Sequence, residues 1–206
     1  WSDLTVFSFH PVKIITTAEG GFITTNNSKY AKIIDMLRNN GITREKKYLK
    51  NKKLAEYYYE QQLLGFNFRM SDIQAALGIS QLQRLKKIIK ERNNLAKNYY
   101  KLFEKYELFV NMQKIDEKSI SSYHLFIILI NRNIDLFKKL RKKNIFCNTH
   151  YRPIHLHPFY KQLGFQKGDY PNAEFYGKYA LSIPLYINLK YEDQEKIIKI
   201  LNNYLK

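Results

Sequence analysis

The chain has 206 residues, of which 45% are hydrophobic and 26% charged, and its formal net charge is +17. This composition excludes a disordered chain, and the longest apolar run, Leu125–Ile130, is far too short to span a bilayer, which needs about 20 residues. The single cysteine, Cys147, excludes an internal disulfide and fits a reducing compartment. We therefore expect a folded cytoplasmic protein that is not inserted in a membrane.

The positive charge has two interpretations, because a basic chain can bind nucleic acid or favour an anionic substrate. The basic residues gather at Lys46–Lys47, Lys52–Lys53, Lys86–Arg92 and Lys138–Lys143. The last two groups fall on helices that we predict below, where charged residues ordinarily face solvent. Lysine, asparagine, isoleucine and tyrosine are all abundant, which indicates a general residue bias. We expect a solvated surface and no nucleic-acid interface.

The first part of the chain contains two predicted strands and one predicted helix. Residues 4–9 and 21–25 form short apolar runs typical of strands. Asn27 can cap a helix over 29–38, with apolar residues at helical spacing and an Asn-Asn-Gly end. Residues 42–64 are rich in lysine and tyrosine, and we interpret them as a long loop or an exposed helix. Two edge strands and one helix cannot form a sizeable core unaided, so we expect a partial α/β layer.

The second part begins with a clear helix start. Ser71–Gln74 has the pattern of a capping box, and Met70 precedes it where a hydrophobic staple would lie. Apolar spacing then predicts a helix over 72–105, long enough to bridge two domains. The remaining predicted elements form a small α+β unit: a strand at 123–130, a helix at 134–143, a strand at 145–150, short helices near 158–163 and 172–179, a strand at 181–185 and a helix at 191–205.

The segment Phe7–Gly21 carries the most specific chemical signal. Lys13 lies just after Pro11, between the two predicted strands, with Ser8 five residues upstream. A single lysine in a lysine-rich chain is ordinarily solvated, but apolar neighbours on both sides make a surface position less expected. A lysine on a stiff loop suits a nucleophilic amine that bonds an aldehyde cofactor, and a nearby hydroxyl can bind its phosphate.

Two further segments carry candidate binding residues. Gly65–Gly78 is a loop that ends at a helix N-terminus, where free N–H groups and the helix dipole favour an anion. Within it, Asn67 offers an amide donor, and Arg69 can pair with a phosphate or a carboxylate. Between His150 and Tyr160, three histidines occur within eight residues. Metal-ligand spacing is absent and prolines interrupt the segment, so we expect no metal site.

These three segments resemble the DegT/DnrJ/EryC1/StrS family of sugar aminotransferases, which use pyridoxal 5'-phosphate (PLP). The resemblance is greatest to the C4 aminotransferases that act on UDP-linked sugars in pseudaminic acid biosynthesis. It implies that Lys13 bonds PLP and moves the substrate proton, and that Ser8 binds the PLP phosphate. It also implies a homodimer, in which Asn67 meets the phosphate in the partner's site.

The resemblance further implies the substrates and the residues near them. An intact enzyme would transfer an amino group from glutamate to the C4 keto carbon of a UDP-linked deoxy-N-acetyl sugar. The segment at 150–160 resembles the family's strand and loop beside the nucleotide-sugar pocket. The residues that we expect to contact substrate are His10, Arg69, His150, Tyr151, His155, His157 and Tyr160.

The implied fold is the C-terminal half of a PLP-dependent type I transferase, an α/β fold. Residues 1–70 would be the tail of the large domain, 71–107 a linking helix, and 108–206 the small α+β domain. The stretch 46–61 makes the segment between Lys13 and Asn67 longer than the family pattern. The family's first half supplies an acid for the pyridine nitrogen, a stacking aromatic and a phosphate-binding turn. We therefore expect little activity from these residues alone.

Three alternatives stay open at this point. The chain could be an inactive truncated remnant, or a subunit completed by a separately encoded half. A basic nucleic-acid-binding protein is less expected, for the reasons given above. Some relatives dehydrate sugars and have histidine in place of the lysine, and Lys13 argues against that reaction here.

Overall fold

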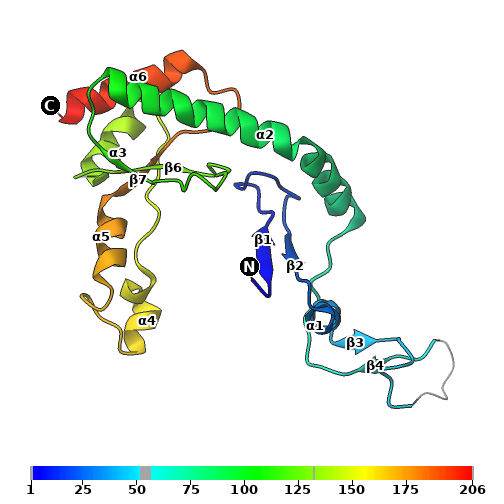
Figure 1. The fold of residues 1–206 in the computed structure, drawn as a ribbon. Helices are drawn as coiled ribbons and strands as arrows, with labels where there is room; N and C mark the ends of the chain where they lie inside the picture. Colours follow the sequence, from blue (N-terminus) through cyan, green and yellow to red (C-terminus); the bar gives the residue numbers. More distant parts are fainter. Residues whose placement is uncertain (1, 52–56, 132, 206) are drawn as a thin grey trace. The chain divides into compact units, whose positions relative to one another are not determined.

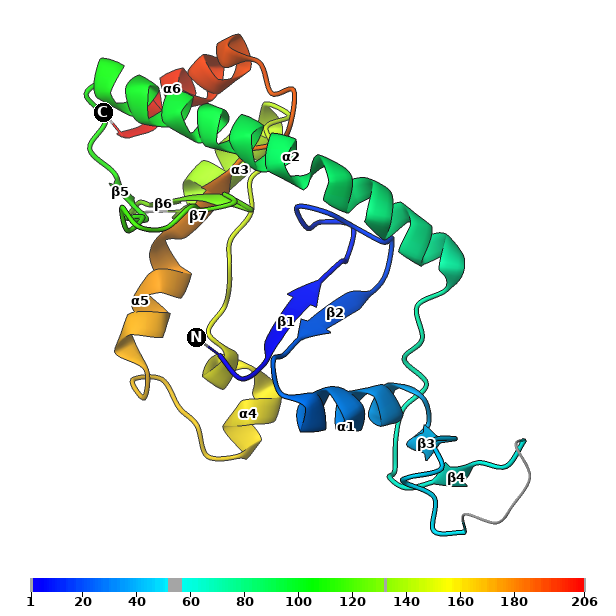
Figure 2. The same ribbon diagram turned by 45° about the vertical axis from the view of Figure 1, so that its right-hand side comes forward.

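A computed structural model of the chain describes residues 2–51, 57–131 and 133–205. The contacts divide it into two compact units, one up to Leu85 and one from Lys86 onward. The long helix α2, Asp72–Lys105, runs through this division. Its bounds agree with the helix predicted over 72–105. The domain limits expected from the sequence stay predictions. Figures 1 and 2 show the elements of both units.

The first unit begins with a ribbon of two antiparallel strands, β1 (Thr5–Ser8) and β2 (Gly21–Thr24). Both strands were predicted, to within one residue at each end. Val6 lies opposite Ile23 and Phe7 opposite Phe22, so apolar pairs occupy both faces of the ribbon. Every residue of the two strands is exposed, and Val6 is 74% exposed. The ribbon by itself therefore encloses no core, as expected for two strands.

The helix α1, Ser28–Arg38, confirms the prediction over 29–38. Asn27 caps it, because its Oδ1 accepts the N–H groups of Lys29 (2.9 Å) and Tyr30 (3.3 Å). The apolar face expected from the sequence is largely uncovered, since Tyr30 and Ile33 are 41% and 42% exposed. Met36 is the buried residue of this helix.

Of the two structures predicted over 42–64, a long loop or an exposed helix, the described residues form a loop, which two short strands at its ends interrupt. Short strands β3 (Ile42–Thr43) and β4 (Glu60–Gln61) pair antiparallel. The carboxylate of Glu60 accepts the N–H groups of Lys50 (2.7 Å) and Asn51 (3.0 Å), which closes the connection near β4. These contacts join residues far apart in sequence, so local pattern did not reveal them. Lys52–Lys53 of the basic cluster lie outside the described residues.

The second unit contains an antiparallel sheet in the order β5-β6-β7. Its elements are β5 (Asn111–Met112), β6 (Phe126–Leu129), α3 (Asn133–Lys142), the 3-10 helix η1 (Ile154–Leu156), α4 (Pro158–Gln162), α5 (Pro171–Tyr179), β7 (Ala180–Ile183) and α6 (Tyr191–Leu205). The predicted helices are confirmed, and η1 was missed. The strand predicted over 145–150 is wrong, because only an isolated bridge joins Asn148 to Ser182. β6 is also shorter than the predicted strand 123–130.

The core of the second unit forms where α2, the sheet, α3 and α6 meet. Leu102, Ile128, Leu136 and Ile198, one from each of these elements, are fully buried. Tyr99 is fully buried as well, and its hydroxyl donates to the carbonyl of Pro184 at 2.7 Å. Burial raises the pKa of this hydroxyl, so Tyr99 is a neutral donor.

Arg92 corrects the expectation that the basic group at Lys86–Arg92 lies on a solvated face. Arg92 is only 8% exposed, and burial lowers the pKa of its guanidinium. Its N–H groups donate to the carbonyl oxygens of Ser122, Tyr123 and His124 at 2.6–3.2 Å. Five donors in a planar fork can satisfy several carbonyls at once, which a residue count does not reveal.

We predict that Leu136→Ala destabilises the second unit by about 2–5 kcal/mol, because it removes a fully buried side chain and leaves a cavity. Ile134→Ala, in the same helix but 62% exposed in the wild type, should change stability by less than about 1 kcal/mol. Urea unfolding followed by circular dichroism measures both variants. An equal loss of unfolding free energy in the two variants would contradict the placement of Leu136 in the core.

Candidate functional site

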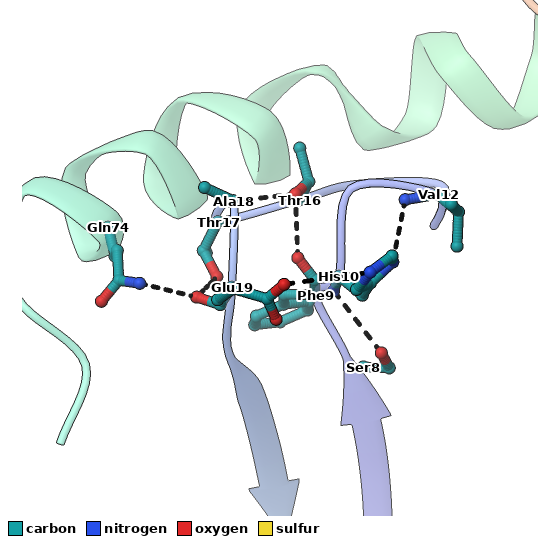
Figure 3. Close-up of polar contacts among 9 residues, drawn as sticks. All are labelled: Ser8, Phe9, His10, Val12, Thr16, Thr17, Ala18, Glu19 and Gln74. Carbon is teal, nitrogen blue, oxygen red and sulfur yellow. Dashed lines mark hydrogen bonds and ion pairs between the residues drawn. The ribbon is translucent and has the colours of Figure 1, made fainter. Parts of the chain in front are cut away.

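The segment Phe9–Gly20, here named the Lys13 loop, connects β1 to β2 and is closed at its base by hydrogen bonds (Figure 3). The N–H of Phe9 donates to the carbonyl of Gly20 at 2.9 Å. The carbonyl of Phe9 accepts the N–H of Thr17 (3.0 Å) and the hydroxyl of Thr16 (2.8 Å). These bonds hold the two ends of the loop together, so its tip is presented by a defined backbone.

Lys13 lies at the tip of this loop and is half-buried. Its N–H donates to the carbonyl of His10 at 2.9 Å, and the N–H of Val12 donates to His10 Nδ1 at 3.3 Å. Within the described part of the chain, the ammonium of Lys13 has no hydrogen-bond or ion-pair partner. A partly buried amine on a stiff turn is therefore available to bond a ligand.

Ser8 and His10 lie beside Lys13 in the same segment. The Oγ of Ser8 accepts the N–H of His10 at 3.5 Å, and among the described residues its hydroxyl proton has no acceptor. His10 Nε2 lies 3.8 Å from the carboxylate of Glu19 across the loop. His10 thus bonds the loop backbone through Nδ1, and its predicted contact with substrate stays a prediction.

Asn67 and Arg69 lie on a separate segment that runs beside the end of α1. The N–H groups of Phe66 and Phe68 donate to the carbonyls of Leu37 (2.7 Å) and Arg38 (2.8 Å), which holds this backbone in place. The side chains of Asn67 and Arg69 are exposed, and neither has a partner among the residues that the structure describes. Their amide and guanidinium donors are therefore open to a ligand outside these residues.

His150 and Tyr151 begin the candidate segment of the second unit. The hydroxyl of Ser182 donates to the carbonyl of Asn148 at 3.0 Å, so its oxygen is left to accept from His150 Nδ1, also at 3.0 Å. This pairing assigns the Nδ1 proton to His150. Tyr151 packs its ring edge-on against His150 and is 69% exposed.

His155 is placed differently from the other predicted substrate residues. It is 6% exposed, and its Nε2 pairs with Glu174 at 2.9 Å. Glu174 also accepts the N–H of Gly168 at 2.6 Å. The hydrogen bond from His155, followed by that from Gly168, lowers the pKa of the Glu174 carboxyl. His157 and Tyr160, by contrast, are exposed.

The structure thus places His10 and Lys13 on one loop and Ser8 on the strand that leads into it, with Asn67 and Arg69 on another segment of the same unit. Thr16 and Thr17, whose hydroxyls bond the loop backbone, were not among the predicted site residues. The available signal was a Thr-Thr pair ahead of two glycines, because threonine hydroxyls often bond nearby backbone in loops.

In the described residues, no group of three or more histidine, cysteine, aspartate or glutamate side chains is arranged to hold a metal ion. None of their helices is both long and apolar enough to cross a bilayer.

The chain is similar to known proteins over nearly its whole length. Residues 1–202 match the DegT/DnrJ/EryC1/StrS aminotransferase family. The UDP-4-amino-4,6-dideoxy-N-acetyl-beta-L-altrosamine transaminase of Campylobacter jejuni is 37% identical over 197 residues, covering 93% of this chain. The chain spans about half the length of the curated relatives it matches, 50% in this case.

Two solved structures share the fold. Spr1654 of Streptococcus pneumoniae, in a PMP form, has a TM-score of 0.86 at 29% identity. Helicobacter pylori PseC, an aminotransferase involved in the biosynthesis of pseudoaminic acid, has a TM-score of 0.83 at 30% identity. Each comparison covers 98% of this chain and 53% of the solved one. The α/β fold expected from the sequence is therefore confirmed.

We predict that the pair of His155 and Glu174 makes stability depend on pH. Because the pKa of Glu174 is lowered from its usual 4.5, the pair stabilises the fold above that pH, and the effect is lost as the pH falls below it. Glu174→Gln should lower the thermal unfolding midpoint at pH 7, and the difference from wild type should narrow below about pH 4.5. Glu104→Gln, an exposed control, should show neither effect.

Proposed function

The chain belongs to the DegT/DnrJ/EryC1/StrS aminotransferase family, and we propose that it serves a PLP-dependent transfer of an amino group to a keto sugar. The single observation that carries the proposal is Lys13, a half-buried amine without a partner in the described residues, on a loop closed at its base. Aminotransferases of this family use PLP, and Spr1654 is known in both PLP and PMP forms.

The residues of the first unit fit this cofactor. An aldehyde needs a free amine, which Lys13 offers, and a phosphate needs hydrogen-bond donors. Ser8 offers a hydroxyl proton that no described residue accepts, on the strand that leads into the same loop. We propose that Lys13 bonds the cofactor aldehyde and that Ser8 donates to the phosphate.

The chemistry divides between the cofactor and the chain. When bound, PLP supplies the electron sink for the carbon that loses its proton. Once the amine of the amino donor has replaced it at the aldehyde carbon, the freed Lys13 Nζ would take that proton from the substrate carbon. It would then return the proton on the cofactor side, as a general base and then a general acid. The hydrogen bonds of the Lys13 loop keep its backbone fixed during these transfers, so that only the side chain moves.

We propose that Asn67 acts in the site of a partner subunit, in a homodimer. Support comes from its setting: the side chain is exposed, its amide has no partner among the described residues, and its backbone neighbours are held by the end of α1. A fixed backbone with a free amide suits a donor that meets a phosphate brought by another subunit.

We propose a UDP-linked deoxy-N-acetyl sugar as the amino acceptor and glutamate as the donor. The activity of the Campylobacter relative and the pathway of PseC support the sugar. Glutamate follows only from the resemblance of the sequence to the family. Arg69, Tyr151, His157 and Tyr160 are exposed and remain candidates for substrate contacts, as do His10 and His150. His155 is proposed to support this region through Glu174. The free, buried Cys147 supports a reducing, cytoplasmic location.

We predict that the protein binds PLP covalently through Lys13. Incubation with PLP, reduction with borohydride and peptide mapping should place the cofactor mass on Lys13, and Lys13→Arg should abolish it, because a guanidinium does not form this bond. Lys29→Arg, a change of an exposed lysine on α1, should leave labelling unchanged. Equal labelling in the wild type and Lys13→Arg would overturn the proposal.

We predict that Asn67→Ala weakens PLP binding by roughly tenfold, the effect of losing a hydrogen bond to a charged group. Co-expression with a Lys13→Ala chain under a second tag gives heterodimers in which only the Asn67→Ala subunit can be labelled. Because the partner then supplies an intact Asn67, that subunit should regain wild-type affinity. An affinity that stays low in the heterodimer would contradict the exchange of Asn67 between subunits.

A further inference from the structure

The N-terminal cap of α2 is connected to the Lys13 loop by one side chain. The capping box predicted at Ser71–Gln74 is confirmed: Gln74 Oε1 accepts the N–H of Ser71 at 3.0 Å, and the N–H of Gln74 donates to Ser71 Oγ at 3.3 Å. The other end of the same amide leaves the helix. Gln74 Nε2 donates to the carbonyl of Glu19 at 3.0 Å, across 55 positions of sequence (Figure 3).

The Glu19 carbonyl lies in a part of the loop with unusual backbone geometry. Its neighbours Ala18 and Gly20 have φ values of +66° and +154°. A residue with a β-carbon is disfavoured at such a φ by about 1–2 kcal/mol, so Ala18 needs surrounding contacts to hold it there. The carbonyl accepts two hydrogen bonds, from Gln74 Nε2 and from the hydroxyl of Thr17 at 2.8 Å.

Close packing one helical turn further along α2 supports the same contact. A β-carbon on Gly78 would lie 2.9 Å from Thr17 Cγ2, and Thr17 is 1% exposed. A β-carbon on Gly20 would lie 2.8 Å from the methyl group of Met70. Met70 therefore covers the end of the loop, and the helix surface has no room beside Thr17 for a larger residue at position 78.

We propose that Gln74 is a positioning residue for Lys13. It holds the returning arm of the Lys13 loop, Thr16–Gly20, against the first two turns of α2. That arm is bonded to Phe9 at the base of the loop, so its position sets where the tip presents the lysine amine. Gln74 itself does not touch Lys13. This inference rests on the proposed function of Lys13 and names a residue on which that function depends.

Two variants separate the cap from the contact with the loop. In Gln74→Glu, one carboxylate oxygen still accepts the N–H of Ser71, and the charge favours the helix N-terminus. The side chain of the variant has no N–H to donate to Glu19, and its second oxygen faces the Glu19 carbonyl. Ser71→Ala removes the hydroxyl of the cap and leaves the bond from Gln74 to Glu19 in place. Helix stability and loop position should therefore respond to different variants.

The rate of borohydride-fixed PLP labelling at Lys13 measures the position of the amine. We expect Gln74→Glu to slow labelling about tenfold, the factor that corresponds to about 1.4 kcal/mol, and Ser71→Ala to stay within about twofold of wild type. The thermal midpoint should instead fall in Ser71→Ala and hold in Gln74→Glu. Labelling at the wild-type rate in Gln74→Glu, or a loss as large in Ser71→Ala, would overturn the proposal.

Hydrogen exchange gives a readout that needs no cofactor. The amides of Phe9, Lys13 and Thr17 donate within the loop, so they should exchange faster in Gln74→Glu than in wild type or Ser71→Ala. If PLP labels the wild type no more than Lys13→Arg, the proposed function fails, and the amide exchange rates still test the role of Gln74. Amide exchange in Gln74→Glu at the wild-type rate would overturn the proposed role of Gln74.

Discussion

The carbonyl oxygens of Phe9 and Glu19 each accept two hydrogen bonds, and this arrangement determines where Lys13 is presented. A lysine side chain rotates about four C–C bonds and has large rotamer entropy. Hydrogen bonds within the loop can therefore fix the backbone of Lys13 but not its side chain. Phe9 closes the base of the loop, and Glu19 joins its returning arm to α2. A candidate catalytic amine is thus placed by groups that do not contact it.

Buried polar groups and the accessible donors of the candidate site differ in their partners. In the second unit, buried side chains such as Arg92, Gln194 and His155 all have hydrogen-bond partners, mostly backbone carbonyls and one carboxylate. An unpaired buried polar group is costly, so these contacts stabilise a closed core. In the first unit, Lys13 and Asn67 have donors without partners in the described residues. Accessible donors without protein partners are what a binding site for an anionic ligand requires.

Much of the secondary structure was predictable from local pattern. Helices α1, α2 and α6 follow apolar spacing, and the caps of the first two lie at Asn27 and Ser71 as predicted. Strand predictions were less successful: 145–150 is almost entirely irregular and 42–64 contains paired strands. A helix satisfies its backbone within itself, whereas a strand depends on a partner elsewhere in the chain.

Local sequence was enough to predict that Lys13 lies on a loop between two strands, with Ser8 before it, because proline, glycine and apolar runs act on local backbone. It could not show that Gln74, already assigned to a cap, also bonds Glu19, or that Arg92 and His155 face inward. These contacts became visible only in the folded chain. Each depends on a hydrogen bond between residues distant in sequence, which exists only when folding brings donor and acceptor together.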